Sequence, residues 1–356
     1  MKKLLTDVCK IQYGFAFDSA KFSDSEGTPL IRIRDVVRGF SETYTTEECS
    51  KDYIVNDGDM LIGMDGEFNI AHWKGGKAYL NQRVCKLIPT NDIDALYLYY
   101  FMPKALKAIE DKTPFVTVKH LSAKELNKVV IPMPSLEEQR KIAGSLRKVD
   151  ELITLRKEQL AKLDQLVKSR FVELFGDPIS NPMGWKIKRF DSLCENLDPR
   201  RKPITASERE AGIYPYYGAS GIVDYVADYL FDEDILLVSE DGANLLMRST
   251  PIAFSVSGKV WVNNHAHVVR FEKMSMQKYI EVFFSMIDIS EHITGSAQPK
   301  LNQAKLNAMM FPVPDDDRLE AFLSFIEQTD KSKLVIQQSL DKLELLKKSL
   351  MQEYFG

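Results

Sequence analysis

The chain has 356 residues, of which 44% are hydrophobic, and carries a formal net charge of −4. This length suits two or three globular domains, and no apolar stretch approaches the ~20 residues of a membrane span. The four cysteines lie far apart without a C-x-x-C pair, so neither a zinc site nor a disulfide framework is indicated, and we expect a cytoplasmic protein. Because the overall balance is slightly acidic, any contact with nucleic acid must come from local basic clusters.

The first part of the chain, residues 1–134, has the pattern of a mixed α/β domain, and residues 177–314 repeat that pattern. In both segments short apolar strands alternate with Gly and Asp turns and precede an apolar helix. In the first segment we predict strands at 30–33, 60–62, 69–73, 78–80 and 84–88, and a helix at 93–109. In the second we predict strands at 235–238, 252–256, 260–262 and 268–271, and a helix at 279–287.

Residues 135–176 read as one long helix with both ends marked. Ser135 is a good N-cap, and Glu138 three residues later completes a capping box. Gly176 suits the left-handed position after the last turn, and Pro178 prevents continuation. At 1.5 Å per residue such a helix is roughly 60 Å long, and its apolar residues recur at steps of three and four. This narrow seam requires a partner helix.

The partner helix is predicted within the same chain, because residues 132–176 align without a gap with residues 312–356. Both Pro-x-Pro pairs and both terminal Phe-Gly pairs coincide, and the acidic run from Asp315 caps the second helix at 315–356. We therefore predict an antiparallel, coiled-coil-like helix pair. Its seam consists of Ile142, Leu146, Val149, Ile153, Leu160, Leu163 and Val167, facing Phe322, Ile326, Ile336, Leu340, Leu343 and Leu350.

The two domains repeat each other more faintly. Asp65-Gly66 resembles Asp241-Gly242, and Asn81-Gln82-Arg83 takes the place of Asn263-Asn264-His265. The chain order is therefore domain, helix, domain, helix. The predicted fold is α+β: two mixed α/β domains separated by the antiparallel helix pair, with a pseudo-two-fold internal repeat and the domains at opposite ends of the pair.

No catalytic constellation is present in the sequence. It lacks a G-x-x-x-x-G-K-[ST] phosphate loop, an H-E-x-x-H zinc motif and the D/N-P-P-F/Y tetrad of amino-methyltransferases. His265 and His267 would face one side of a strand, but the sequence suggests no third ligand, so we expect no metal site.

Polar clusters in loops indicate a different chemistry. Asn and Gln can bond adenine bidentately and Arg can bond guanine, while Lys and Arg hold phosphates. For any one of these clusters a solvated loop is the simpler explanation, but their recurrence at equivalent places of two domains favours DNA. The candidate DNA contacts are Lys74, Lys77, Asn81, Gln82, Arg83, Lys119, His120, Arg200, Arg201, Lys202, Tyr217, Ser220, Asn263, Asn264, His265, Gln298 and Lys300.

Three stretches resemble the specificity subunits of Type I restriction–modification enzymes: IPMPSLEEQRKIAGSL (131–146), FGDPISNPMGW (175–185) and YPYYGASGIVDYV (214–226). The resemblance covers nearly the whole chain. It departs from the family pattern at 315–318, where Asp-Asp-Asp-Arg replaces the usual start that contains Glu-Gln.

The resemblance implies that 1–134 and 177–314 are target-recognition domains, each reading one half of a split, asymmetric sequence in double-stranded DNA. It also implies that the helices at 135–176 and 315–356 set the gap and dock two modification subunits, through which restriction subunits join. The chain itself would be no enzyme and would bind no cofactor or membrane. S-adenosylmethionine, ATP and Mg²⁺ would belong to its partners. Two alternatives stay open: a protein-interaction scaffold with a helical spacer, and a DNA methyltransferase, which the missing tetrad opposes.

Overall fold

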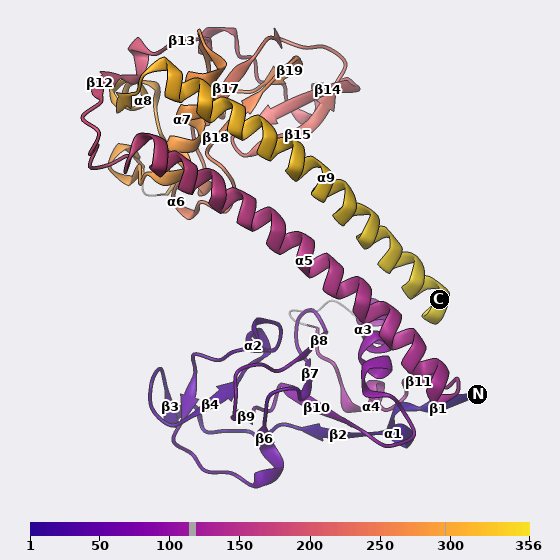
Figure 1. The fold of residues 1–356 in the computed structure, drawn as a ribbon. Helices are drawn as coiled ribbons and strands as arrows, with labels where there is room; N and C mark the ends of the chain where they lie inside the picture. The colour runs from indigo at the N-terminus through magenta and orange to yellow at the C-terminus, as the bar shows by residue number, and fades with distance from the viewer. Residues whose placement is uncertain (114–118, 296) are drawn as a thin grey trace. The chain divides into compact units, whose positions relative to one another are not determined.

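Each repeated segment ends in a helix of 40 residues, α5 (Leu136–Phe175) and α9 (Asp316–Phe355). The computed structural model describes residues 1–113, 119–295 and 297–356 and divides into two units (Figure 1). Unit 1 comprises Met1–Leu155 and Leu340–Gly356, and unit 2 comprises Arg156–Ser339. Each unit therefore contains one α/β domain together with parts of both long helices. Within the described residues, no helix has the length and apolar content needed to cross a bilayer.

The domain of unit 1, called domain 1 below, has three sheets with strand orders β1-β11, β2-β10-β7-β8 and β3-β5-β4-β9-β6. Its strands are β1 (Lys2–Leu4), β2 (Cys9–Tyr13), β3 (Phe22–Ser23), β4 (Thr28–Ile31), β5 (Tyr44–Thr45), β6 (Ile54–Val55), β7 (Met60–Gly63), β8 (Asn69–His72), β9 (Ala78–Leu80), β10 (Val84–Pro89) and β11 (Val130–Pro132). Its helices are α1 (Leu5–Val8), α2 (Ile33–Arg38), α3 (Ala95–Lys112) and α4 (Ala123–Leu126).

The domain of unit 2, domain 2, repeats this topology with strand orders β12-β21, β13-β20-β17-β18 and β15-β14-β19-β16. Its strands are β12 (Lys186–Arg189), β13 (Cys194–Asn196), β14 (Ala211–Gly218), β15 (Gly221–Val226), β16 (Phe231–Asp232), β17 (Ile235–Ser239), β18 (Ala253–Val256), β19 (Lys259–Val262), β20 (Ala266–Phe271) and β21 (Met310–Val313). Its helices are α6 (Asn244–Met247), α7 (Met274–Met286) and α8 (Gln303–Ala308).

The internal repeat is visible in single contacts. In domain 1 the Tyr97 hydroxyl donates to the Pro132 carbonyl oxygen at 2.9 Å, and in domain 2 the Tyr279 hydroxyl donates to that of Pro312 at 2.9 Å. Both tyrosines are buried on the apolar helix that covers the four-stranded sheet. Each anchors the Pro-x-Pro segment from which a long helix starts.

The helix ends follow the predicted signals. Ser135 Oγ accepts the Glu138 amide at 3.2 Å, and Asp315 Oδ1 accepts the Arg318 amide at 3.0 Å. Gly176 adopts φ of +81°, the left-handed conformation in which glycine avoids a Cβ clash. These local signals account for helix bounds that lie within one residue of 135–176 and 315–356.

The long helices pair antiparallel in both units. In unit 1 Lys347 lies 2.6 Å from Asp150, and in unit 2 Lys333 lies 2.6 Å from Asp164 and Arg156 Nε donates to Ser339 Oγ at 3.1 Å. All of the predicted seam residues are buried or half-buried. Lys347, Lys333 and Arg156, which interrupt the apolar seam, are thus bonded across the helix pair.

Aromatic side chains dock each helix end onto a domain. In unit 1 the Phe355 ring lies 5.3 Å from that of Tyr97 and 5.8 Å from that of Phe101. In unit 2 the Phe175 ring lies 4.9 Å from that of Tyr279. The C-terminal end of α9 therefore packs on domain 1, and that of α5 packs on domain 2.

The strand predicted at residues 30–33 is wrong at its C-terminal end. Strand β4 stops at Ile31, and α2 begins at Ile33. Asp35 Oδ2 accepts the Arg32 amide at 2.9 Å, and Gly39 closes the helix with φ of +80°. Burial of Val36 against the core stabilises this turn of helix although β-branched residues favour strands.

Candidate nucleic-acid interface

In domain 1 two predicted loops meet at the carboxylate of Asp65. His120 Nδ1 lies 2.5 Å from Asp65 Oδ1, and Arg83 Nε lies 3.6 Å from Asp65 Oδ2. Arg83 Nη1 also lies 3.3 Å from His120 Nδ1. The Gly66 amide donates to the Lys119 carbonyl oxygen at 2.9 Å, so the backbone fixes this crossing of chains.

In domain 2 the equivalent loops meet at Asp241. His265 Nδ1 lies 2.9 Å from both carboxylate oxygens of Asp241. The Gly242 amide donates to the Pro299 carbonyl oxygen at 3.0 Å, and a β-bridge joins Asp241 to Lys300. The two domains thus share one arrangement, with Arg83 and His120 in one and His265 and Lys300 in the other.

The exposed side chains around these two acids are polar or basic. Arg83 and His265 are each about half exposed, at 50% and 49%. Gln82, His120, Asn264, Gln298 and Lys300 are also exposed. Amide, guanidinium and imidazole groups presented in this way match the hydrogen-bonding groups of base edges.

Asn81 and Asn263 shape their turns through their side-chain oxygens. Asn81 Oδ1 accepts the Gln82 amide at 2.8 Å, and Asn263 Oδ1 accepts the His265 amide at 2.8 Å. Asn263 is buried, which corrects its prediction as a base contact. Asn81 is half-buried and stays a candidate contact.

The Gly/Tyr stretch forms the β14–β15 hairpin of domain 2, and its turn at 218–221 lies beside the Asn263 loop. The Asn263 amide donates to the Tyr217 carbonyl oxygen at 3.1 Å, and Ser239 Oγ donates to the Ala219 carbonyl oxygen. Tyr217 is half-buried near Phe254, with ring centroids 6.0 Å apart, whereas Ser220 is exposed. Of the two predicted hairpin residues, Ser220 is thus the more accessible.

The three cations at 200–202 have different surroundings. Arg201 is 13% exposed, bonds Glu240 at 2.6 Å and lies 3.2 Å from Asp198. This corrects its prediction as a phosphate contact, because a buried guanidinium held by two carboxylates cannot reach DNA. Arg200 pairs with Glu233 at 2.6 Å and lies over the Phe231 ring, and Lys202 is exposed.

Asp198, Glu240 and His267 place possible metal ligands within 4.8 Å of one another, which their distances in sequence do not reveal. The protein's own groups satisfy this cluster, however. His267 Nδ1 lies 2.6 Å from Asp198 and Nε2 lies 2.8 Å from the Leu301 carbonyl oxygen, so both ring nitrogens are in use. With Arg201 neutralising the acids, the cluster is a structural ion network beneath the Asp241 loop.

The remaining predicted lysines differ in whether their ammonium groups already have a bonding partner. Lys119 donates to the Glu110 carbonyl oxygen at 2.9 Å and is thereby tied to the end of α3. Lys74 and Lys77 are exposed and, among the residues that the structure describes, have no hydrogen-bond or ion-pair partner. They remain suitable phosphate contacts.

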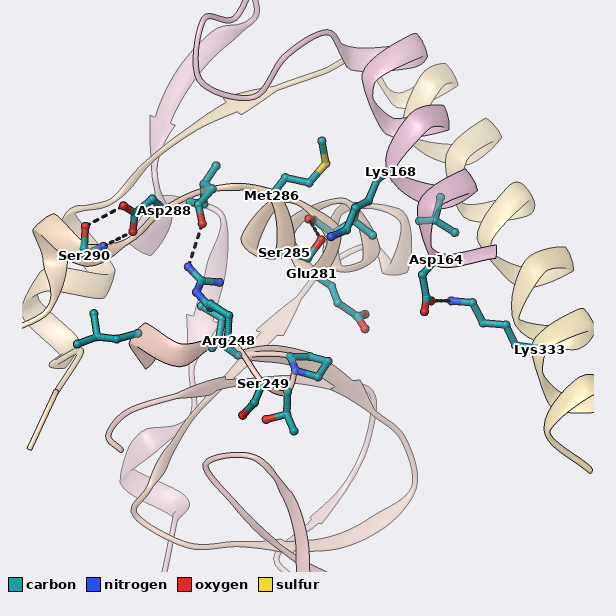
Figure 2. A pocket seen from close by; sticks show the side chains of 17 residues that line it. Asp164, Lys168, Arg248, Ser249, Glu281, Ser285, Met286, Asp288, Ser290 and Lys333 are labelled. Carbon is teal, nitrogen blue, oxygen red and sulfur yellow. Dashed lines mark hydrogen bonds and ion pairs between the residues drawn. The ribbon is translucent and has the colours of Figure 1, made fainter. Parts of the chain in front are cut away.

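A groove in unit 2 runs between α5, α7 and the segment after α6 (Figure 2). Several of its charged groups are already paired. Arg248 donates to the carbonyl oxygens of Phe284 and Ile287 at 2.9 Å, and Asp164 binds Lys333 at 2.6 Å. Lys168, which also lines the groove, is exposed and has no ion-pair partner among the described residues.

Sequence reasoning missed the acids Asp65 and Asp241 as organisers of the interface, although their Asp-Gly motif recurs in both domains. It also missed three arginines at or next to α2, at positions 32, 34 and 38, of which only the first lies in the predicted strand 30–33. The sequence did contain a signal for this basic segment, namely three arginines within eight residues, I-R-I-R-D-V-V-R at 31–38.

Comparisons with known proteins identify the family of the chain. A family described as the Type I restriction modification DNA specificity domain matches residues 1–165 and 182–345. Over 166 residues the chain is 39% identical to the EcoBI specificity subunit of Escherichia coli, a match covering 46% of this chain and 35% of that relative. The match thus spans about a third of that protein's length.

Two further relatives cover most of the chain. The MjaVIII specificity subunit of Methanocaldococcus jannaschii is 23% identical over 369 residues, covering 91% of this chain and 87% of the relative. The solved S subunit of a type I restriction–modification system from M. genitalium superposes with a TM-score of 0.62 at 14% identity, covering 100% of this chain and 96% of that one. The chain therefore belongs to the Type I restriction–modification DNA specificity family.

Proposed function

We propose that this chain is the non-catalytic, sequence-reading subunit of a Type I restriction–modification enzyme. Each domain reads one half of a bipartite target in double-stranded DNA through the loops around Asp65 or Asp241. The observation that carries this proposal is the repeated acid-anchored arrangement with different exposed side chains. The pair Arg83 and His120 in domain 1 and the pair His265 and Lys300 in domain 2 have different hydrogen-bonding patterns. The two domains should therefore read different half-targets.

We further propose that α5 and α9 dock two modification subunits, with restriction subunits joining through these. Exposed apolar side chains on both helices support this role, among them Leu155, Leu166, Leu334 and Leu345. In this assembly S-adenosylmethionine lies on the modification subunits and ATP with Mg²⁺ on the restriction subunits. This chain determines which DNA sequence is recognised and how far apart its two halves lie.

The test is co-expression with its modification subunit, followed by mapping of methylated adenines. Replacing Asn264 and His265 together with alanine should relax one half of the motif and leave the other unchanged. Replacing Gln82 and Arg83 should relax only the opposite half. Each lost bidentate contact should reduce discrimination by about 1–3 kcal/mol. Equal loss in both halves would contradict independent reading.

The rival function is a protein-interaction scaffold, which the net charge of −4 favours. A scaffold needs no particular base sequence. Methylation whose motif is insensitive to both double variants, in a complex that still assembles, would support the scaffold.

A further inference from the structure

Helix α2 leaves the sheet of domain 1 beside the Asn81–Arg83 loop. Strand β4, which leads into α2, pairs parallel with β9, with Leu30 opposite Tyr79 and Ile31 opposite Leu80. Parallel strands end at the same sheet edge, so the segment after β4 and the loop after β9 emerge together. In domain 2 the same edge brings the 218–221 turn to the Asn263 loop.

The inner face of α2 fixes the helix on the domain. Ile33 lies so close to Gly63 that a Cβ there would stand 3.3 Å from Ile33 Cγ2, and Val36 is fully buried. The outer face carries Arg34, Val37 and Arg38, spaced three and four residues apart. All three are exposed, Val37 to 67%. This face therefore offers two guanidinium groups beside an apolar side chain, groups that can contact guanine acceptors and a thymine methyl.

A buried carboxylate organises the arginines. Asp35 has no solvent exposure, and its Oδ1 lies 3.8 Å from Arg34 Nε and 3.9 Å from Arg38 Nη1. Arg38 is further committed to Glu42 at 2.7 Å and to the Phe40 ring at 4.2 Å. Besides the 3.8 Å contact with Asp35, Arg34 has, among the described residues, only a long bond to Thr43 at 3.5 Å, and its side chain is 59% exposed. Arg34 is therefore the oriented but available cation of this face.

Further basic groups border the helix. The Cβ of Lys74 lies 3.7 Å from where a Cβ on Gly39 would stand, which places Lys74 at the C-terminal end of α2. At the other end, the Arg32 guanidinium has no hydrogen-bond or ion-pair partner among the described residues. Both are suited to hold phosphates on either side of a groove.

We propose that the outer face of α2 enters the major groove as a second reading element of domain 1, an inference that rests on the proposed function. Arg34 donates to the O6 and N7 acceptors of a guanine, and Val37 contacts a thymine methyl group. Lys74 and Arg32 hold the flanking phosphates. Domain 2 has a tight turn at this place, so the two domains read with different elements.

Two substitutions of Arg34 in the full complex separate base reading from phosphate binding. Arg34→Ala removes both the charge and the planar fork, whereas Arg34→Lys keeps the charge and loses the fork. Both variants should make one position of the first half-target degenerate, with about 5- to 150-fold less discrimination against the wrong base. Lys74→Ala should instead weaken binding to all sequences and reduce the salt dependence of the affinity.

Lys10→Ala is the matched control, because Lys10 is exposed on β2, at the opposite edge of the sheet from the β7 and β8 strands that contact α2. It should leave the motif unchanged. If Arg34→Lys keeps the wild-type motif, or if neither variant alters it while the Gln82/Arg83 variant does, α2 reads no base and this inference is overturned. If the wild-type complex methylates without sequence preference, the proposed function itself is overturned.

Discussion

At the scale of single residues, adjacent side chains of similar chemistry have separate roles. Arg201 is enclosed with Asp198 and Glu240 below the Asp241 loop, whereas Arg200 lies at the surface with Glu233. The first stabilises the loops that carry the proposed readers, because the Leu301 amide, next to Lys300, donates to the Glu240 carbonyl oxygen at 2.8 Å. Arg200, in contrast, forms its ion pair at the protein surface.

Arg201→Ala should destabilise domain 2 by up to about 3–5 kcal/mol, because it removes the guanidinium that joins two buried carboxylates and leaves them only His267 and Lys300. Arg200→Ala should cost no more than about 1 kcal/mol, since a half-exposed pair is screened by solvent. Thermal unfolding of the two full-length variants measures the difference. Equal effects would show that the buried network does not support the domain.

The same network should make domain 2 sensitive to acid. Burial raises the pKa of Asp198, but His267, the Val268 amide and Arg201 together hold that pKa below its usual value. Burial also raises the pKa of Glu240, and Arg201, His267 and Lys300 together hold it low. Groups with lowered pKa in the folded state stabilise it above their unfolded values, about 3.9 and 4.3, and lose that contribution as pH falls further. The thermal unfolding midpoint, measured at pH values from 6 to 3, should therefore fall once the pH is below about 4. The drop should be smaller in Glu240→Gln, and an unchanged drop would exclude this cause.

At the scale of elements, the helix ends hold each unit together. Phe355 is 5% exposed, contacts the rings of Tyr97 and Phe101, and accepts a hydrogen bond on its carbonyl oxygen from Lys104. The partly exposed ion pairs at Asp150 and Asp164 help to fix the register of the apolar seam, since a slipped pairing would leave the lysines facing apolar residues.

Phe355→Ala should cost about 3–5 kcal/mol by opening a cavity between α9 and α3. Leu345→Ala, ten residues earlier on an exposed part of the helix, should stay within about 0.5 kcal/mol of wild type. Chemical denaturation of both variants gives the comparison. A Phe355 effect as small as that of Leu345 would mean that the end of α9 does not anchor unit 1.

At the scale of the whole molecule, long-range periodicity was predictable and local exceptions were not. The bounds of α5 and α9 follow from a seam maintained over 40 residues and from caps at both ends. The apolar runs at β7 and β17 identified the central strands. In contrast, the β-branched residues of α2 indicate a strand, and only tertiary burial of Val36 selects the helix. The sequence also could not separate Arg200 from Arg201, because the burial of Arg201 depends on Glu240 and Ala266, which are 39 and 65 residues away.

The internal repeat makes the last prediction possible. Residues 1–176 contain domain 1 and all of α5 but lack Phe355, which packs on Tyr97 in the full chain. The repeat supplies a substitute, because Phe175 packs on Tyr279 in the corresponding way. Such a half-chain should therefore dimerise, with Phe175 of each copy on Tyr97 of the other.

The dimer would present two copies of domain 1 and, with modification subunits, should methylate a palindromic split target. Sedimentation measures the association, and Phe175→Asp within the half-chain should abolish it, because a charge cannot be buried against the tyrosine. The exposed Leu166→Asp substitution is the control and should leave the dimer intact. A folded monomeric half-chain would show that α5 does not pair through this seam, and the pseudo-two-fold repeat would then have no functional counterpart in assembly.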